Sequence, residues 1–266
     1  MNTPILVTGG TGTLGRRVVP LLVDAGRAVR VLTRHPAADS PGIQHVEGDT
    51  VAGRGLDAAL TGVEIVLHLA GGAKGDDIAA RNLAAAACAA DVRHLILISV
   101  VGADRMPIGY FRAKAAAERA VARSGVPWTV LRAAQLHDFV LPIVRSMARL
   151  PLLPAPRGLR FEPVDRDEVA ARLAELTLGA PAGRVPDLAG PEVLDIPQLA
   201  AAYAAARAGA DARIRHRRPL PVRLPGAVGR AYRAGDNLAA SDAQRGGVTW
   251  RSFLARRALD TVPKRS

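Results

Sequence analysis

The feature that most constrains the fold is a run of glycines directly after the first apolar segment of the chain. The segment ILVTGG (5–10) leads into Gly9, Gly12 and Gly15, spaced G-x-x-G-x-x-G, and a helical pattern then continues to Gly26. Glycine permits a tight turn and lets backbone N–H groups approach an anion, and a helix N-terminus adds partial positive charge. Because this loop follows a strand pattern and opens a helix, we predict that it binds the pyrophosphate of a dinucleotide rather than serving only as a turn.

Apolar, β-branched runs recur along the first half of the chain with helical segments between them. They cover residues 5–10, 29–34, 45–49, 63–70, 94–100 and 128–133. These runs are almost continuously apolar, as strands covered on both faces require. The alternation predicts an α/β fold with a doubly wound parallel sheet, in which ligands bind beyond the carboxyl ends of the strands.

Beyond about Gln135 the elements become shorter and are interrupted by prolines. We expect residues 1–135 to form a dinucleotide-binding Rossmann core. Residues 136–266 should form a small α/β substrate-side cap that interleaves with the core in a single structural unit. Within the cap, Asp165 and Glu168 match a capping box, and Asp195 opens a later helix. The apolar stretch 139–153 indicates a hydrophobic substrate.

The distribution of charge and the lengths of the apolar segments indicate which kinds of partner to expect. The net charge is +12, but 33 of the 36 basic residues are arginines spread along the chain. The one dense basic run, 213–219, is also consistent with an exposed strand, so we expect no nucleic-acid partner. No apolar segment is long enough to span a bilayer, and no export signal is visible at the N-terminus. We therefore expect a cytoplasmic protein, a monomer or a homodimer, with a small-molecule substrate.

The cysteine and histidine content argues against disulfides and metals. Cys88 is the only cysteine, and its alanine-rich surroundings predict a buried structural thiol. The six histidines lack the close spacing of metal ligands, so we predict no metal.

The end of the second apolar run distinguishes between dinucleotides. It reads VLTR, and Thr33 and Arg34 offer a hydroxyl and a guanidinium that suit a 2′-phosphate, without a carboxylate to repel it. We therefore expect NADP(H) in preference to NAD(H), although Arg34 could also be an ordinary surface arginine. Asp49, after the third run, is placed to bind adenine, and Asp also suits a turn.

The cofactor-binding prediction gathers the residues that follow these strands. The predicted set is Gly9, Gly10, Thr11, Gly12, Thr13, Leu14, Gly15, Thr33, Arg34, Asp49, Ala70, Gly71, Lys114, Ala133 and Gln135.

The stretch GYFRAK places Tyr110 and Lys114 four residues apart, on one face of a helix. A tyrosine with its ordinary pKa near ~10 is a poor acid–base group at neutral pH, and a nearby ammonium lowers that pKa. Lysine is rare in this chain, so its presence here indicates that a titratable ammonium is needed. The alternative is an ordinary helix start.

Several segments together resemble the atypical short-chain dehydrogenase/reductases, specifically the NmrA-like NAD(P)H-binding group. They are TGGTGTLG, VLTR, GD, LILISVVGAD, YFRAK, WTVLRAAQLHDF and TWRSFLA. The resemblance implies a Rossmann domain with a small C-terminal substrate region, often linked to NADP(H). Members of this group include reductases and also proteins that bind the cofactor without known turnover.

The resemblance also implies roles for three catalytic residues. Tyr110 would donate a proton to the substrate carbonyl, and Lys114 would lower the tyrosine pKa and hold the nicotinamide ribose. Ser99 would polarise the carbonyl, and Glu118 would add a supporting ion pair. After the sixth run the group usually has a proline, where this chain has alanines. The residues that follow and could reach nicotinamide or substrate are Gln135, His137 and Asp138. His137 could equally be a packing or capping residue.

These features predict an NADP(H)-dependent oxidoreductase that reduces a carbonyl or an activated double bond of a small, hydrophobic molecule. One alternative is an NADP(H)-binding redox-sensing or regulatory protein without turnover. Another is an NAD(P)-dependent epimerase or dehydratase. The set Ser99, Tyr110 and Lys114 favours the enzyme over the sensor. The C-terminal part is short for a nucleotide-sugar pocket.

Overall fold

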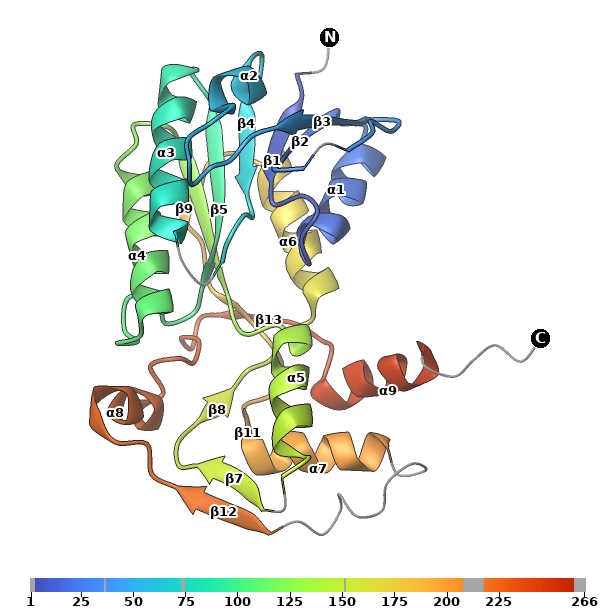
Figure 1. The fold of residues 1–266 in the computed structure, drawn as a ribbon, viewed down its shortest axis with the longest axis vertical. Helices are drawn as coiled ribbons and strands as arrows, with labels where there is room; N and C mark the ends of the chain where they lie inside the picture. The colour runs from blue at the N-terminus through green and yellow to red at the C-terminus, as the bar shows by residue number, and fades with distance from the viewer. Residues whose placement is uncertain (1–2, 36, 73–74, 151, 208–217, 261–266) are drawn as a thin grey trace, which may run out of the picture. The chain divides into compact units, whose positions relative to one another are not determined.

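The computed structural model describes residues 3–35, 37–72, 75–150, 152–207 and 218–260. The chain forms two compact units (Figure 1). The first comprises residues 1–104, 108–132 and 166–186, and the second comprises residues 105–107, 133–165 and 187–266. The first unit therefore takes in a segment from the C-terminal half of the chain.

The first unit is built on a sheet with the strand order β6-β5-β4-β1-β2-β3. The pairs from β5 to β3 are all parallel, and the short β9 is parallel to β6. From β1 the chain adds β2 and β3 on one side, and it then adds β4, β5 and β6 on the other side. The strand order therefore reverses between β1 and β4, which confirms the predicted doubly wound fold. The strand bounds are β1 (Ile5–Thr8), β2 (Val29–Thr33), β3 (Ile43–Glu47), β4 (Ile65–His68), β5 (His94–Val100), β6 (Trp128–Ala133) and β9 (Gly183–Arg184).

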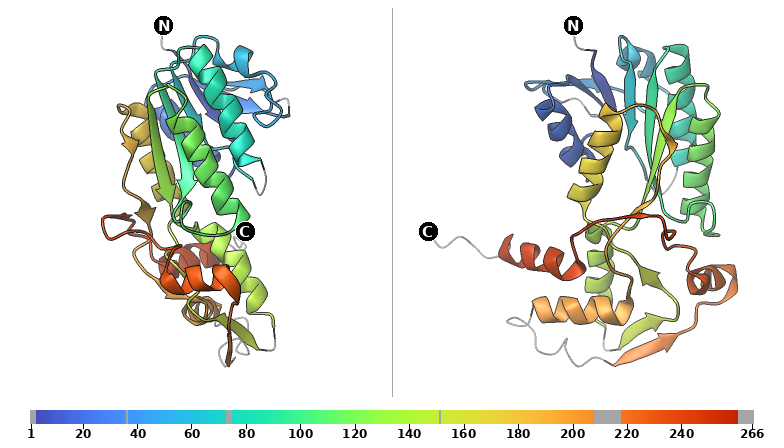
Figure 2. Two further views of the ribbon diagram at one scale, coloured as in Figure 1. Left: turned by 90° about the vertical axis from the view of Figure 1, so that its left-hand side faces the viewer. Right: turned by 180° about the vertical axis from the view of Figure 1, so that it is seen from behind.

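Helices cover both faces of this sheet. Helix α3 packs against α4, and α1 packs against α6. Figure 2 shows these two pairs on opposite faces. The helix bounds are α1 (Gly15–Asp24), α2 (Leu56–Leu60), α3 (Asp76–Ala89), α4 (Gly109–Ala122) and α6 (Arg166–Leu178).

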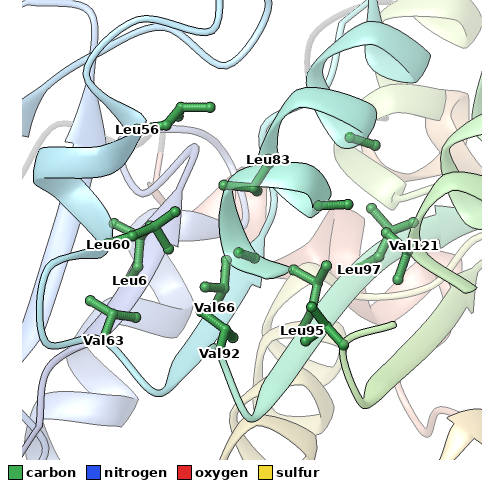
Figure 3. Close-up of a cluster of buried hydrophobic side chains, with 14 of the residues drawn as sticks. Leu6, Leu56, Leu60, Val63, Val66, Leu83, Val92, Leu95, Leu97 and Val121 are labelled. Carbon is green, nitrogen blue, oxygen red and sulfur yellow. The ribbon is translucent and has the colours of Figure 1, made fainter. Parts of the chain in front are cut away.

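The apolar strands and the alanine-rich helix α3 form the core of the first unit. Every residue of β5 is buried, as its continuous apolar sequence predicts. In Figure 3, Leu6, Val66 and Leu95 of the strands lie beneath Leu60 of α2 and Leu83 of α3. Each such side chain contributes roughly 1.5–3 kcal/mol when it is fully buried. The core thus fixes the strand ends at which the predicted ligand residues lie.

Cys88 is exposed, so the prediction of a buried thiol was wrong. Its helix α3 buries Ala80, Ala84 and Ala87, which recur at helical spacing. Cys88 follows Ala87 directly and is therefore rotated about 100° away from that buried face.

The second unit contains short strands and helices around its own apolar core. Strands β7 and β12 pair in parallel, β8 and β11 pair antiparallel, and β10 pairs in parallel with β13. The core includes Trp250, Phe253 and Leu199. The bounds are α5 (His137–Met147), β7 (Leu153–Pro156), β8 (Arg160–Phe161), β10 (Leu188–Ala189), β11 (Leu194–Asp195), α7 (Ile196–Ala206), β12 (Pro219–Val222), α8 (Gly226–Ala234), β13 (Gln244–Arg245) and α9 (Trp250–Asp260).

Helix α7 begins as the sequence predicts. Asp195 accepts a hydrogen bond from the Gln198 backbone N–H, and the Gln198 side chain accepts one from the Asp195 N–H, both at 2.8 Å. This capping box satisfies two N–H groups at the helix start. Helix α6 begins directly after Asp165, and its capping box with Glu168 stays a prediction.

Within the described ranges, no helix is long and apolar enough to cross a bilayer. The same residues hold no cluster of three or more His, Cys, Asp or Glu that could bind a metal ion. The basic run 213–219 lies mostly outside the described residues.

Candidate active site

The glycine loop is a tight turn that packs against the chain after β4. Gly9 has a φ of +71°, and a Cβ atom there would lie 2.6 Å from the Ala70 nitrogen. A Cβ atom on Gly15 would lie 2.3 Å from the Gly9 carbonyl oxygen, and the Gly12 N–H donates to the same oxygen at 2.9 Å. No larger residue fits at Gly9 or Gly15. Together with the N-terminus of α1, this arrangement fits the pyrophosphate of a dinucleotide.

A buried polar contact joins the ends of β1 and β4 beside this loop. The Thr8 hydroxyl lies 2.6 Å from His68 Nδ1 and accepts a bond from the Ala70 N–H at 3.3 Å. Burial lowers the pKa of His68 to about 3, and the charge of Lys114 acts in the same direction. His68 is therefore neutral at neutral pH. Neither residue was predicted from the sequence to belong to the site.

The predicted 2′-phosphate residues lie at the end of β2. The Thr33 hydroxyl donates to the His35 carbonyl at 3.0 Å and accepts from the His35 N–H at 3.2 Å, which closes a local turn. Arg34, between them, is exposed. A guanidinium and a hydroxyl thus lie together at the carboxyl end of this strand.

Asp49 forms a turn at the end of β3, the neighbouring strand. Its Oδ1 accepts from the N–H groups of Val51 and Ala52 at 2.8 and 3.1 Å. The bond from Ala52 lowers the pKa of Asp49, and the Val51 bond and the Arg34 charge act in the same direction. The turn role is therefore present in the structure, and the adenine role stays a prediction.

Lys114 is buried and reaches the main chain after β4. Its Nζ lies 2.9 Å from Asp76 Oδ2, and Asp76 Oδ1 accepts from the Gly72 N–H at 2.6 Å. A Cβ atom on Gly71 would lie 3.0 Å from Lys114 Nζ. The structure thus brings together Lys114 and Gly71, which were both predicted to bind the cofactor. Asp76 was not predicted from the sequence; its position at the start of a helix behind the fourth apolar run was the available signal.

Tyr110 lies in the first turn of α4, and its side chain is 40 % exposed. Its ring packs edge-on against Phe111 at 5.5 Å between centroids. Partial burial raises the pKa of Tyr110, and the negative charge of Asp76 raises it further. The expected lowering of this pKa by Lys114 was wrong, because burial of the phenol raises the pKa and the Asp76 carboxylate acts in the same direction.

Ser99 belongs to a polar network that links β5, α4 and β6. Its hydroxyl donates to Glu118 Oε1 at 2.5 Å, and Arg132 donates to both Glu118 oxygens at 2.8 and 2.6 Å. Arg132 also contacts Asp104 at 2.8 Å. Burial opposes the charge of Arg132, but the bonds to Glu118 and Asp104 raise its pKa overall. The predicted ion pair of Glu118 is present, and its partner is Arg132. The role of Ser99 in polarising a carbonyl stays a prediction.

The predicted residues at the end of β6 and beyond it lie in the second unit. Ala133 pairs with Leu188 of β10, and the Gln135 carbonyl accepts from the Val164 N–H at 3.0 Å. The side-chain oxygen of Gln135 is buried without a hydrogen-bond partner among the described residues. Their contacts with the cofactor stay predictions.

His137 packs inside the second unit. It is fully buried and stacks on Phe253 with 4.8 Å between ring centroids. Burial lowers its pKa to about 4, although Asp165 and Asp138 oppose this shift. These contacts favour the packing role for His137 over contact with a ligand.

Comparison with known proteins identifies the family of this chain. A family model described as NAD(P)H-binding matches residues 9–177, which include the glycine loop, Lys114 and Tyr110. A relative from Streptomyces griseus subsp. griseus, named (4-alkanoyl-5-oxo-2,5-dihydrofuran-3-yl)methyl phosphate reductase, is 36% identical over 199 residues. That alignment covers 71% of this chain and 69% of the relative.

Solved structures share the fold. Citrobacter sp. triphenylmethane reductase matches with a TM-score of 0.79 at 22% identity, over 97% of this chain and 100% of the other. The NADPH-dependent quinone oxidoreductase of Escherichia coli, solved with NADPH, matches with a TM-score of 0.76 at 23% identity, over 95% and 99% of the two chains.

The family model covers well over half of the chain, and the Streptomyces relative aligns over more than two thirds of both sequences. These matches confirm the predicted fold and the predicted nicotinamide dinucleotide cofactor. The chain therefore belongs to the NAD(P)H-binding family.

Proposed function

We propose that this protein is an NADP(H)-dependent reductase acting on a carbonyl or an activated double bond of a small, hydrophobic molecule. The observation that carries this proposal is the buried Lys114 ammonium next to Gly71, on the same segment whose Ala70 packs against Gly9 of the glycine loop. A cofactor held by that loop would extend along the ends of β1 and β4 toward Lys114. Tyr110 lies one helical turn away on the same helix.

The chemistry of the site supports reduction. When bound, NADPH supplies a hydride. Because the pKa of Tyr110 is raised above its ordinary value, the side chain is a phenol at neutral pH and can donate a proton or a hydrogen bond. Lys114 is placed to hold the nicotinamide ribose. In this proposal Tyr110 and Lys114 are the catalytic residues, and Ser99 orders α4 through Glu118.

Two further observations support the substrate class. The Streptomyces relative is named as a reductase of the methyl phosphate of an alkanoyl-substituted oxo-dihydrofuran, whose ring portion contains carbonyl groups and a double bond. In this chain the apolar stretch 139–153 leaves Phe139 61 % exposed, with Leu150 and Leu152 exposed as well. Exposed apolar side chains in one segment are typical of a surface that binds an apolar molecule.

The preference for NADP(H) rests on Arg34 and Thr33 at the end of β2. A charge-assisted bond to a phosphate contributes about 1.5–3 kcal/mol, which corresponds to a preference of about tenfold to a hundredfold or somewhat more. No carboxylate follows β2 directly to bind the ribose hydroxyls of NAD(H).

Calorimetric titration with NADPH, NADP⁺, NADH and NAD⁺ tests the cofactor assignment. We expect the phosphorylated pair to bind at least about tenfold more tightly, and Arg34→Ala to remove that preference while leaving NADH binding unchanged. Arg93→Ala is the matched control, since Arg93 is an exposed arginine that pairs with Glu64 at 3.9 Å. Equal binding of NADPH and NADH by the wild-type protein would show that the assignment is wrong.

NADPH oxidation with a panel of quinones and conjugated enones then tests turnover. The reductase proposal predicts oxidation of NADPH that depends on the acceptor. A protein that reduces none of these acceptors, and that binds NADPH and NADP⁺ with very different affinities, would instead have the properties of a redox sensor.

A further inference from the structure

The Asp76 carboxylate bridges two parts of the proposed site. One oxygen accepts from the Gly72 N–H at 2.6 Å, and the other lies 2.9 Å from Lys114 Nζ. Asp76 is the first residue of α3, and Lys114 lies in α4, which packs against α3. A single side chain thus fixes the lysine to the main chain after β4.

The bridge is buried. Asp76 is 4 % exposed and Lys114 is 6 % exposed. Burying two charges is costly unless they are paired and hydrogen-bonded, and removing one partner leaves the other uncompensated. Among the described residues, Asp76 is the only carboxylate that forms an ion pair with Lys114. The position of the ammonium therefore depends on this carboxylate.

Other titratable groups around the pair do not replace Asp76. His68 of β4 is neutral at neutral pH, because burial and the Lys114 charge lower its pKa to about 3. Glu118, one turn beyond Lys114 in α4, is bonded to Arg132 of β6 and to Ser99 of β5. Asp76 is the charge that acts on the Tyr110 phenol.

We propose that Asp76 is a positioning residue of the reductase site, which fixes the Lys114 ammonium against Gly71 and Gly72 and places its own negative charge near Tyr110. This inference rests on the proposed function, because Lys114 and Tyr110 are its catalytic residues. Two consequences follow. Without Asp76 the Tyr110 phenol ionises at lower pH. NADPH also binds more weakly, because the Lys114 side chain is no longer held in place.

The test compares Asp76→Asn with Asp77→Asn. Asp77 is the next residue of α3, and its carboxylate pairs with Arg81 at 3.3 Å toward the surface. Both substitutions remove one negative charge from the same helix turn, but only the first removes the partner of Lys114. Thermal unfolding establishes that each variant is folded.

The first readout is the tyrosinate absorbance of each protein as the pH rises. Subtracting the same titration of a Tyr110→Phe version isolates Tyr110 from Tyr203 and Tyr232. We expect Asp76→Asn to move the Tyr110 titration to lower pH by roughly half a unit to one unit, and Asp77→Asn to leave it in place. This readout needs neither nucleotide nor substrate, and a purely structural role of Asp76 would not move it.

The second readout is NADPH affinity, measured from the fluorescence of the bound nucleotide. We expect Asp76→Asn to bind NADPH about tenfold more weakly than the wild-type protein, with Asp77→Asn unchanged. If the wild-type protein binds no NADPH, the proposed function fails. If the wild-type protein binds NADPH and Asp76→Asn matches it in both readouts, the positioning role is overturned while the proposed function stands.

A double variant keeps the test available if Asp76→Asn does not fold. Combining Asp76→Asn with Lys114→Met leaves no unpaired charge in the buried site. Tyr110 should still titrate at lower pH than in the wild-type protein, because the Asp76 charge is gone. An unchanged titration in the folded double variant would overturn the inference.

Discussion

The Thr8 hydroxyl lies 2.6 Å from His68 Nδ1, and both side chains are almost completely buried at the ends of adjacent strands. The same hydroxyl accepts from the Ala70 N–H. One oxygen atom of β1 therefore links the strand that leads into the glycine loop to the segment after β4 that packs against that loop.

Replacing Thr8 with valine keeps the shape of the side chain but removes this oxygen. The buried His68 nitrogen and the Ala70 N–H would both lose their partner, so we expect the free energy of unfolding to fall by about 1–3 kcal/mol or more. Urea unfolding measures it. The Thr8→Ser control keeps the hydroxyl and removes one methyl group, which should cost about 1 kcal/mol. A larger loss for serine than for valine would contradict the role of this hydrogen bond.

The raised pKa of Tyr110 gives the proposed reaction a defined pH dependence. The phenol keeps its proton at every pH below its pKa, and that pKa lies above the ordinary tyrosine value of 10.0. Tyr110 can therefore donate a proton up to at least pH 10 and loses this ability only at higher pH. We expect the Tyr110-dependent part of kcat for reduction to be constant between about pH 6 and about pH 9. A fall in that part of kcat within this range would mean that the phenol is more acidic than its surroundings imply.

Tyr110→Phe should reduce kcat by about a hundredfold to ten-thousandfold while NADPH affinity stays unchanged. Tyr203→Phe is the control, since the Tyr203 hydroxyl accepts only from Arg207 at 3.1 Å within the described residues. Steady-state kinetics and nucleotide titration separate the two effects. Equal turnover by the two variants would exclude Tyr110 as the proton donor.

Glu118→Gln tests the network that holds α4 on the sheet. Glu118 and Arg132 are 14% and 5% exposed, and the substitution leaves the Arg132 guanidinium with only Asp104 as a charged partner among the described residues. We expect a loss of about 3 kcal/mol, since a buried charge that loses its main partner costs about 3–5 kcal/mol.

Glu64→Gln removes a carboxylate from a surface pair, because Glu64 and Arg93 are 3.9 Å apart and their side chains are 42% and 77% exposed. Its expected cost is below about 1 kcal/mol, and urea unfolding compares the two variants. Similar costs would show that the Glu118 network contributes no more to stability than a surface contact.

His137 should make the fold sensitive to acid. Burial lowers its pKa from 6.5 to about 4, so the unfolded chain binds this proton first as the pH falls. The contribution of neutral His137 to the free energy of unfolding is fully present above about pH 6.5. It decreases by up to about 3 kcal/mol as the pH falls toward about 4. His137→Phe keeps a ring against Phe253 and removes this proton. Urea unfolding at neutral and acidic pH should show a weaker acid dependence in the variant, and parallel curves would contradict the assignment.

Local sequence patterns were enough to predict the sheet and the tight glycine turn after its first strand. Glycine spacing, continuous apolar runs and the residues that follow them are properties of short segments, and packing on both faces of a parallel sheet leaves few alternatives. The positions of Gly9, Gly15, Arg34 and Lys114 were therefore accessible from the sequence alone.

Pairings between distant segments were not accessible in the same way. The sequence near Lys114 contains no sign that its partner is Asp76. The expected direction of the Tyr110 pKa was wrong because the sequence shows neither the burial of the phenol nor the nearby Asp76 charge. Ser99 was matched to a strand end correctly, but the Glu118 and Arg132 side chains that orient it come from two other elements. Such contacts depend on how the helices pack, which no local pattern specifies.

Residues 166–186 belong to the first unit although they follow part of the second unit along the chain, and this order affects folding during synthesis on the ribosome. Helix α6 packs against α1 and contacts β4 and β5, so this face of the sheet is completed by residues far downstream of the strands. Until they leave the exit tunnel, the apolar surfaces of α1 and the sheet remain uncovered and are exposed to aggregation. A nascent chain that ends at residue 135 carries every strand from β1 to β6 without this cover, and chaperones would have to shield it until α6 is made.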